Sequence, residues 1–266
     1  MLPVIAALGL CLANWKILQG GWRGPRGFQI AGFDGNAVGL AVVAIAAAIY
    51  FWGVTYAIAL IVAVTVHEFG HVAAFRVCGH SDARFRLIPL LGGVAISNTA
   101  PASADKAFFI TLMGPAINLG PMALCLALAE AIFVSTFNTD LPYEIAGYLY
   151  IQGMVFAALN FFNLLPLWPL DGGKLTQRLV YTFAPDLTRQ TSIAMSVLAV
   201  LLCVLTRSWF LLFFVLLGWQ GLVQSEMLLR VQRPLSRQRA LLALAAYAAT
   251  ATAFFLAGHP LLLGLF

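Results

Sequence analysis

Two histidines and a glutamate lie close together inside one long apolar stretch. His67 and His71 are four residues apart, and Glu68 follows the first histidine directly. Residues i and i+4 share one face of a helix, so both imidazoles can reach the same metal ion. Imidazole is a typical zinc ligand, and a neighbouring glutamate can take a proton from a metal-bound water. The spacing predicts a zinc-binding helix. The alternative, two satisfied core histidines, is disfavoured by the cost of ionisable groups in an apolar helix.

A catalytic zinc site needs a third protein ligand, and the best candidate is Asp171. It follows a segment that contains Pro166 and Pro169, and two glycines come directly after it. Prolines end helices and glycines free the backbone, so this segment can turn a carboxylate inward. The alternative is that Asp171 caps a helix that begins near Lys174.

The elements that must position these side chains are membrane helices. Of the 266 residues, 62% are hydrophobic and only 9% are charged, whereas soluble domains carry about 25% charged residues. The apolar residues form blocks of roughly the length that crosses about 30 Å of hydrocarbon. We therefore predict an all-α polytopic membrane protein with six to eight transmembrane helices. The predicted helices lie at about 1–18, 37–52, 54–78, 107–133, 143–165, 191–206, 208–229 and 240–258.

One apolar segment, near 87–98, is too broken to cross the membrane as a helix. We predict that it forms a short membrane-dipping β-hairpin, which is tolerated only where it is buried in protein or lines a wet cavity. The alternative is a surface loop that lies on the headgroups. The breaks between helices are too short for a folded soluble domain. We predict three regions: an N-terminal hydrophobic segment and loop at 1–36, a catalytic transmembrane core at 37–183, and C-terminal transmembrane helices at 184–266.

The charge distribution predicts the orientation of the chain. The net charge is +5, but the basic residues are spread through loops rather than gathered on one face, which argues against nucleic-acid binding. If every predicted helix spans, all 15 Lys and Arg residues except Arg207 lie on one side. The positive-inside rule makes that side cytoplasmic. We therefore expect a multi-pass protein of the plasma or inner membrane with its active site toward the cytoplasm. Residues 1–18 lack a basic n-region and are expected to be a retained helix.

Three motifs, in this order, resemble those of the site-2 protease family of intramembrane zinc metalloproteases, peptidase family M50. The segment near 87–98 also resembles the membrane-dipping β-hairpin of that family. The resemblance covers roughly residues 54–175 and is to a minimal form without a PDZ or CBS domain. The motifs are H-E-x-G-H at 67–71, G-P-x-x-N at 114–118 and N-x-x-P-x-x-P-x-D-G-G at 163–173.

The resemblance implies an intramembrane zinc endopeptidase that cleaves transmembrane segments of membrane-anchored proteins. It implies one Zn²⁺ ion held by His67, His71 and Asp171, with Glu68 as general base. The implied partners are a single-pass membrane protein substrate, a regulatory membrane protein and the lipid bilayer, with no nucleic acid. The alternatives are a catalytically silent membrane scaffold and a zinc transporter that uses the same ligands. The intact ligand set disfavours the first, and the scarcity of ionisable residues in the other helices disfavours the second.

Five further residues are candidates for binding the substrate or its oxyanion: Asn118, Asn160, Asn163, Gly92 and Gly93. Asn118 follows a proline within a helix, where its amide could instead satisfy the carbonyls that proline leaves unpaired. Asn160 and Asn163 lie on the helix that leads to Asp171, and they could donate to the oxyanion, orient Asp171 or cap the helix end. The two glycines lie in an extended segment that could accept an unwound substrate as an added strand.

Overall fold

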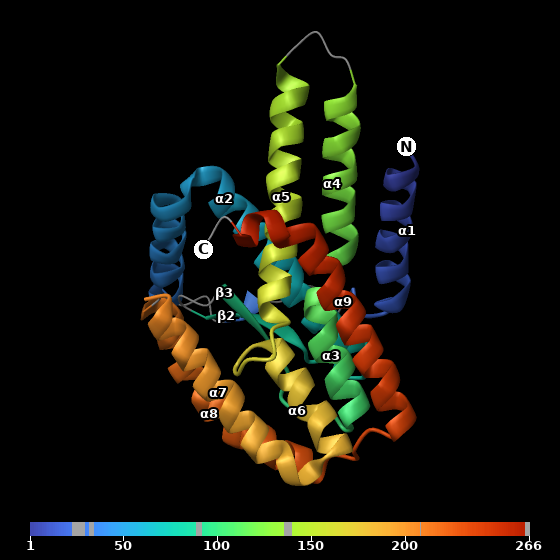
Figure 1. Ribbon diagram of the computed structural model, residues 1–266, viewed down its shortest axis with the longest axis vertical. Helices are drawn as coiled ribbons and strands as arrows, with labels where there is room; N and C mark the ends of the chain where they lie inside the picture. Colours follow the sequence, from blue (N-terminus) through green and yellow to red (C-terminus); the bar gives the residue numbers. More distant parts are fainter. Residues whose placement is uncertain (23–29, 32–34, 89–91, 136–139, 208, 264–266) are drawn as a thin grey trace. The chain divides into compact units, whose positions relative to one another are not determined.

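The computed structural model describes residues 1–22, 30–31, 35–88, 92–135, 140–207 and 209–263 (Figure 1). The described chain is mostly helical. Its helices are α1 (Leu2–Ile17), α2 (Gly35–Val77), α3 (Ala104–Ala116), α4 (Leu119–Val134), α5 (Leu141–Asn163), α6 (Asp171–Phe183), the 3₁₀-helix η1 (Pro185–Leu187), α7 (Thr188–Leu205), α8 (Trp209–Val231) and α9 (Arg237–Leu263).

Several of these helices are suited to a bilayer. Among the described residues, five helical segments are long and apolar enough to cross a membrane, and α1 is a shorter apolar helix. The predicted fold class, an all-α polytopic membrane protein with a short β-hairpin, is confirmed. The five segments are Ile45–Val77, Ala104–Val134, Leu141–Asn163, Pro185–Leu205 and Arg237–Leu261.

The helix boundaries follow glycine and proline. The boundary predicted between 37–52 and 54–78 is a break inside α2 at Gly53, where φ is 81° and ψ is 165°. Glycine adopts this backbone without a steric penalty because it has no Cβ. The helix predicted at 107–133 is two helices, α3 and α4. Pro115 lies in the last turn of α3, and it lacks the N–H that would continue the helical hydrogen bonds.

Helix α6 lies between the helices predicted at 143–165 and 191–206 and was not among the predicted helices, although a helix near Lys174 was named as the alternative for Asp171. This helix carries polar and charged residues along its length, so a search for apolar blocks passes over it. Leu175, Gln177 and Arg178 are nevertheless buried. An amphipathic helix of this kind is stabilised by the elements against which it packs rather than by its own hydropathy.

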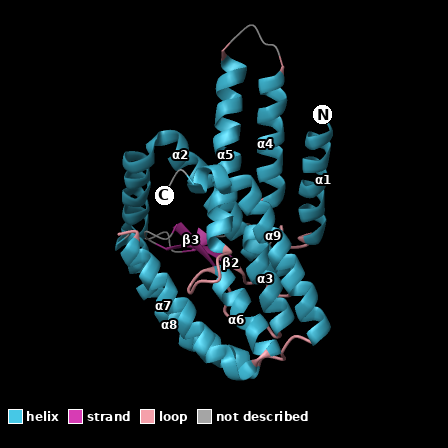
Figure 2. Ribbon diagram, viewed as in Figure 1, coloured by secondary structure: helices cyan, strands magenta, loops and turns pink. Residues whose placement is uncertain are grey.

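A small sheet accompanies the helices (Figure 2). Strand β2 (Arg84–Ile88) pairs antiparallel with β3 (Gly92–Ile96), with Phe85 opposite Ala95. The predicted β-hairpin is therefore confirmed, and it begins a few residues earlier than expected. The two-residue strand β1 (Ile30–Ala31), which was not predicted, pairs parallel with β2, so the strand order is β1-β2-β3. Residues 89–91, which fall within the predicted hairpin, lie outside the described residues.

The base of the hairpin is held by Asp82. Its carboxylate accepts the Asn98 backbone N–H at 2.6 Å and the Ser97 hydroxyl at 3.0 Å. The Asn98 N–H keeps the pKa of Asp82 below its usual value, and partial burial opposes this shift. Since Asp82 precedes β2 and Asn98 follows β3, these bonds fix where the two strands start and finish.

The described chain forms two compact units. The first contains Met1–Thr99, Met113–Phe161 and Thr252–Phe266, and the second contains Ala100–Leu112 and Phe162–Ala251. Both histidines of the H-E-x-G-H motif and the hairpin belong to the first unit. Asp171 belongs to the second.

In the first unit, α1 packs against α4. One of its side chains also bonds to carbonyl groups at the break between α3 and α4. The Asn14 side-chain amide donates to the carbonyl oxygens of Ala116 at 3.3 Å and Ile117 at 3.0 Å. These carbonyls lie just after Pro115, where the helix is interrupted. A buried carbonyl without a partner costs about 1–3 kcal/mol. This cost explains why a polar residue, Asn14, occurs in the otherwise apolar helix α1.

In the second unit, polar side chains join three helices. Gln177 of α6 is fully buried. Its amide donates to the Ser192 hydroxyl of α7 at 2.9 Å, and the Ser225 hydroxyl of α8 donates to its carbonyl oxygen at 2.5 Å. Buried side-chain bonds of this kind fix how helices pack where lipid removes most of the hydrophobic driving force.

Candidate metal centre

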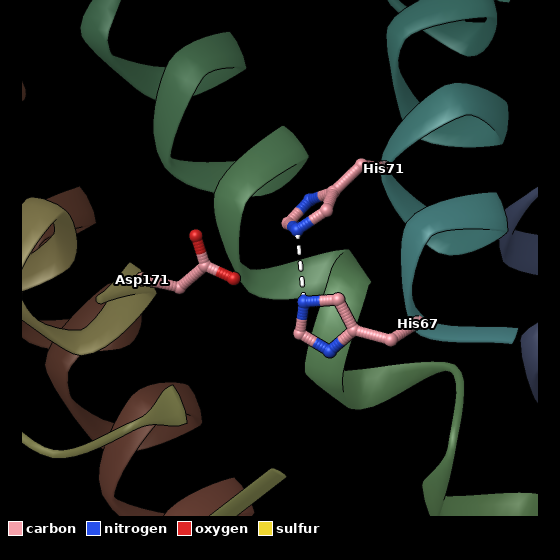
Figure 3. Close-up of side chains that lie close together, drawn as sticks. All are labelled: His67, His71 and Asp171. Atoms are coloured by element: carbon pink, nitrogen blue, oxygen red, sulfur yellow. Dashed lines mark hydrogen bonds between the residues drawn. The ribbon is translucent and has the colours of Figure 1, made fainter. Parts of the chain in front are cut away.

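The two histidines face one another on α2. His67 and His71 are both buried, and their Nε2 atoms lie 3.1 Å apart with the rings at 80° (Figure 3). Two imidazoles bound to one tetrahedral zinc, with Zn–N distances of about 2.0–2.1 Å, hold their nitrogens about 3.3 Å apart. The observed pair is therefore spaced for one zinc ion. The i, i+4 spacing on a continuous helix is sufficient to produce this geometry.

Asn160 of α5 determines which nitrogen of His67 carries the proton. The Asn160 Oδ1 atom lies 2.8 Å from His67 Nδ1. An amide oxygen can only accept, so Nδ1–H is the donor and the lone pair is on Nε2, the nitrogen that faces His71. Asn160 is held in turn by donating its own N–H to the Phe156 carbonyl at 2.7 Å. The sequence suggested Asn160 for the oxyanion or for Asp171. The structure places it against His67, on the nitrogen that faces away from His71.

Replacing Asn160 with alanine should lower zinc affinity by about 10- to 100-fold, the usual cost of losing such a partner. The measurement is competition for zinc against a chromogenic chelator. Gln152→Ala is the matched control, because Gln152 is also buried on α5 and donates to a backbone carbonyl of α2, that of Ala59, at 3.0 Å. We expect similar losses of thermal stability from both variants but a loss of zinc affinity only from Asn160→Ala. Equal zinc affinities would contradict the assignment.

Glu68 extends from α2 toward the hairpin. Its Oε2 atom accepts the backbone N–H of Ala95 in β3 at 3.1 Å. The residue is half-buried. The carboxylate therefore lies on the side of α2 that meets the sheet, next in sequence to His67.

Asn118 lies at the break between α3 and α4 and contacts the histidine helix. Its amide donates to the Ala63 carbonyl of α2 at 3.3 Å, one turn before His67. The side chain is fully buried, and its Oδ1 atom has no hydrogen-bond partner among the described residues. The acceptor is a carbonyl of α2 and not one that Pro115 leaves unpaired, so the contact is structural but differs from the repair that the sequence suggested. The role in substrate binding stays a prediction.

Two glycines let α2 and α3 approach closely at the histidines. A Cβ at Gly70 would lie 2.3 Å from the Met113 carbonyl oxygen, and a Cβ at Gly114 would lie 2.2 Å from ring atoms of His71. Both separations are far inside van der Waals contact. Gly114, the first residue of the G-P-x-x-N motif, is thus required because the His71 ring lies against its backbone.

Gly114→Ala should displace the His71 ring and lower zinc affinity at least tenfold. The reason is that the clash involves a side chain that is itself buried and cannot move freely. Zinc content and thermal unfolding of the purified protein measure the effect. The matched control is Gly147→Ala in α5, where a Cβ would meet no atom within 4 Å. It should keep the wild-type zinc content. If Gly114→Ala binds zinc as the control does, the His71 ring does not need this glycine.

Asp171 is the first residue of α6, and the residue in the N-cap position is Leu170. Asp171 is therefore not the cap of its helix, which was the structural alternative. Its carboxylate lies in the first turn, where the helix dipole favours negative charge. The side chain is only 8% exposed, and Oδ1 lies 3.0 Å from the Lys174 ammonium. The residue is thus a buried carboxylate with a lysine partner on the same helix.

The two glycines after Asp171 allow α6 to start against the preceding turn. A Cβ at Gly172 would lie 2.2 Å from the Leu164 carbonyl oxygen, and one at Gly173 would lie 2.4 Å from that of Leu167. Larger residues would push the start of α6 away from this segment. The two glycines of the D-G-G sequence are therefore required because no side chain fits there, in addition to the backbone freedom that they provide.

Arg178, one turn after Lys174, adds positive charge to the same helix. It is buried, and it donates to the Lys174 carbonyl at 3.2 Å. Burial lowers the pKa of Arg178 to about 10, and the carboxylate of Asp171 acts in the opposite direction. Arg178 is therefore still protonated at neutral pH.

His67, His71 and Asp171 have side chains of the types that could hold a metal ion. Both histidines belong to the first compact unit and Asp171 belongs to the second. Two imidazole nitrogens and one carboxylate oxygen suit zinc, and three protein ligands leave the fourth position for water. Of the remaining predicted residues, Asn163 ends α5, and Gly92 and Gly93 open β3. Their role in substrate binding stays a prediction.

Several known proteins are similar in sequence to this chain. The model of peptidase family M50 matches residues 55–205. A zinc metalloprotease of Methanocaldococcus jannaschii is 30% identical over 132 residues, which is 49% of this chain and 35% of that protein. Stage IV sporulation protein FB of Bacillus subtilis is 29% identical over 159 residues, or 57% of this chain and 49% of that protein. The matches therefore span a third to a half of the length of these relatives.

A solved structure is also similar. The site-2 protease from Methanocaldococcus jannaschii aligns with a TM-score of 0.44 and 22% identity, covering 71% of this chain and 87% of that chain.

Proposed function

The chain belongs to peptidase family M50, and from this premise we propose that it is an intramembrane zinc endopeptidase that cleaves transmembrane segments of membrane-anchored proteins. The observation that carries the proposal is the pair of buried imidazole Nε2 atoms 3.1 Å apart on an apolar helix that can cross a membrane. Ionisable groups are costly in such a helix and are usually functional. Asp171, from the same candidate metal group, is the proposed third ligand.

Each residue has a role in this proposal. One bound Zn²⁺ would be held by His67, His71 and Asp171, and it would lower the pKa of its water to about 7 and polarise the scissile carbonyl. Glu68 would take the proton from that water and return it to the leaving amine. Asn160 would keep the His67 Nε2 lone pair directed at the ion.

The substrate would be a single-pass membrane protein, cut within or near the bilayer. A helical segment hides its peptide bonds, so it must unwind locally before hydrolysis. Unwinding in hydrocarbon exposes unpaired peptide groups, and small or helix-breaking residues lower that cost. We further propose that the protein resides in the plasma or inner membrane with the site toward the cytoplasm, and that a regulatory membrane protein controls access. The distribution of Lys and Arg supports this orientation.

The test is purification in detergent, measurement of zinc per chain, and an assay of cleavage of a single-pass substrate in liposomes. We expect about one zinc ion per chain, loss of cleavage after chelation, and recovery when zinc is added back. Cleavage that survives complete removal of metal would contradict the proposal. Zinc flux into protein-containing liposomes without any cleavage would favour a transporter, and bound zinc with neither activity would favour a scaffold.

A further inference from the structure

The hydrogen bond between Glu68 and Ala95 joins the proposed general base to an edge strand. Strand β3 is the last strand in the order β1-β2-β3, so within the described residues it has a strand partner on one side only. Ala95 lies opposite Phe85 of β2. Its N–H nevertheless donates to the Glu68 carboxylate at 3.1 Å, which places this N–H on the edge of β3 that faces away from β2.

The same edge presents further main-chain groups that do not face β2. In an antiparallel ladder the N–H and C=O of one residue point to the same side, and the pattern repeats every second residue. The C=O of Ala95 and the peptide groups of Gly93 therefore also lie on the open edge. Such an edge pairs readily with another extended chain, through the main chain and largely independently of side chains.

We propose that Glu68 and the substrate main chain compete for the Ala95 N–H. Glu68 accepts it in the free enzyme, and a substrate carbonyl takes it when an unwound segment pairs with β3. The Glu68 carboxylate is then released for its contact with the hydrolytic water. The inference rests on the proposed protease function and adds a link between substrate docking and the freeing of the base.

The relative strengths of these hydrogen bonds make the exchange at the Ala95 N–H selective for an unwound substrate. A hydrogen bond to a charged acceptor is stronger than one between neutral groups. A single substrate carbonyl therefore does not displace Glu68. A segment that is extended from Gly93 to Ala95 gains several main-chain bonds at once and can do so. An intact helical segment offers no free carbonyl and leaves Glu68 in place.

Two substitutions separate this exchange from a purely structural contact. Glu68→Gln keeps a side-chain oxygen that can accept the Ala95 N–H, whereas Glu68→Ala has none. Neither variant should cleave, so binding of an intact substrate can be measured in both. The probe is a fluorescent transmembrane peptide with a central Gly-Pro break, which the wild type cleaves, in phosphatidylcholine nanodiscs. We expect Glu68→Ala to bind it about fivefold more tightly than Glu68→Gln, which corresponds to one hydrogen bond of about 1 kcal/mol.

Hydrogen–deuterium exchange provides a second measurement that does not depend on peptide affinity. The Ala95 amide should exchange faster in Glu68→Ala than in Glu68→Gln, and adding the peptide should restore its protection. The Val94 amide, one residue earlier and on the opposite side of the strand, should not change. Unaltered Ala95 exchange in Glu68→Ala, or exchange that the bound peptide does not slow, would overturn the proposal.

Controls keep this result separate from the protease proposal. The pair Glu144→Ala and Glu144→Gln changes an exposed carboxylate at the start of α5 and should bind the peptide equally. Zinc content must match between the two Glu68 variants. If the wild type cleaves with zinc but both Glu68 variants bind the peptide equally, the exchange is wrong and the protease function stands. If the wild type shows no zinc-dependent cleavage, the protease function itself fails.

Discussion

Glu68→Gln should abolish cleavage while the protein keeps its zinc. The amide is nearly the same size as the carboxylate but cannot take a proton from water. Loss of a positioned general base typically lowers the rate by about 10²–10⁴-fold. The proposed ligands His67, His71 and Asp171 are unchanged, so zinc content should remain that of the wild type. The measurement combines zinc analysis of the purified protein with cleavage of a single-pass substrate over a long time course.

The control for this prediction is Glu144→Gln, which makes the same chemical change at an exposed site in α5. It should cleave at the wild-type rate. Turnover by Glu68→Gln at more than about a tenth of the wild-type rate would remove Glu68 from the role of general base. Loss of zinc from this variant would instead indicate that Glu68 supports the metal site itself.

Asp171→Ala should lose zinc and activity together. It removes one of three proposed ligands, so its effect should exceed the 10- to 100-fold loss of affinity that accompanies removal of an outer-shell partner. It also leaves Lys174 without the carboxylate that it contacts at 3.0 Å. Zinc titration against a competing chelator measures the loss. Thermal unfolding with and without zinc shows whether metal still stabilises the variant.

The matched control is Asp186→Ala, an exposed aspartate in the 3₁₀-helix after α6. It should retain full zinc content and the same zinc-dependent stabilisation as the wild type. An Asp171→Ala protein that still binds zinc at wild-type affinity would show that the third ligand is another group. This is the sharpest test of the ligand set, because two histidines alone do not complete a catalytic zinc site.

Features that follow from a local sequence pattern could be predicted without a structure. The composition indicates a membrane protein. A helix that crosses about 30 Å of hydrocarbon needs a long apolar block, and such blocks can be read directly from the sequence. The histidine pair follows from the 3.6-residue period of a helix, and the break at Gly53 follows from a glycine between two apolar blocks. The hairpin could be inferred from an apolar segment that is too short and too broken to span.

Contacts between distant segments could not be recognised in this way. His67 and Asn160 are 93 residues apart, and nothing local to either indicates that one determines the tautomer of the other. The same is true of Gly114, whose missing side chain makes room for the His71 ring, and of Asn14, which repairs the helix break after Pro115. Helix α6 was missed because its burial comes from its neighbours and its own hydropathy is low.

The two histidines and the glutamate of the H-E-x-G-H motif illustrate this division. The sequence by itself determined that both imidazoles share one face of an apolar helix, because helical periodicity and hydrophobic block length are local properties. Only the tertiary structure decided what surrounds them: Asn160 behind His67, Gly114 beneath His71, and the edge of β3 at Glu68. These neighbours come from segments far along the chain, and packing alone brings them to the same helix.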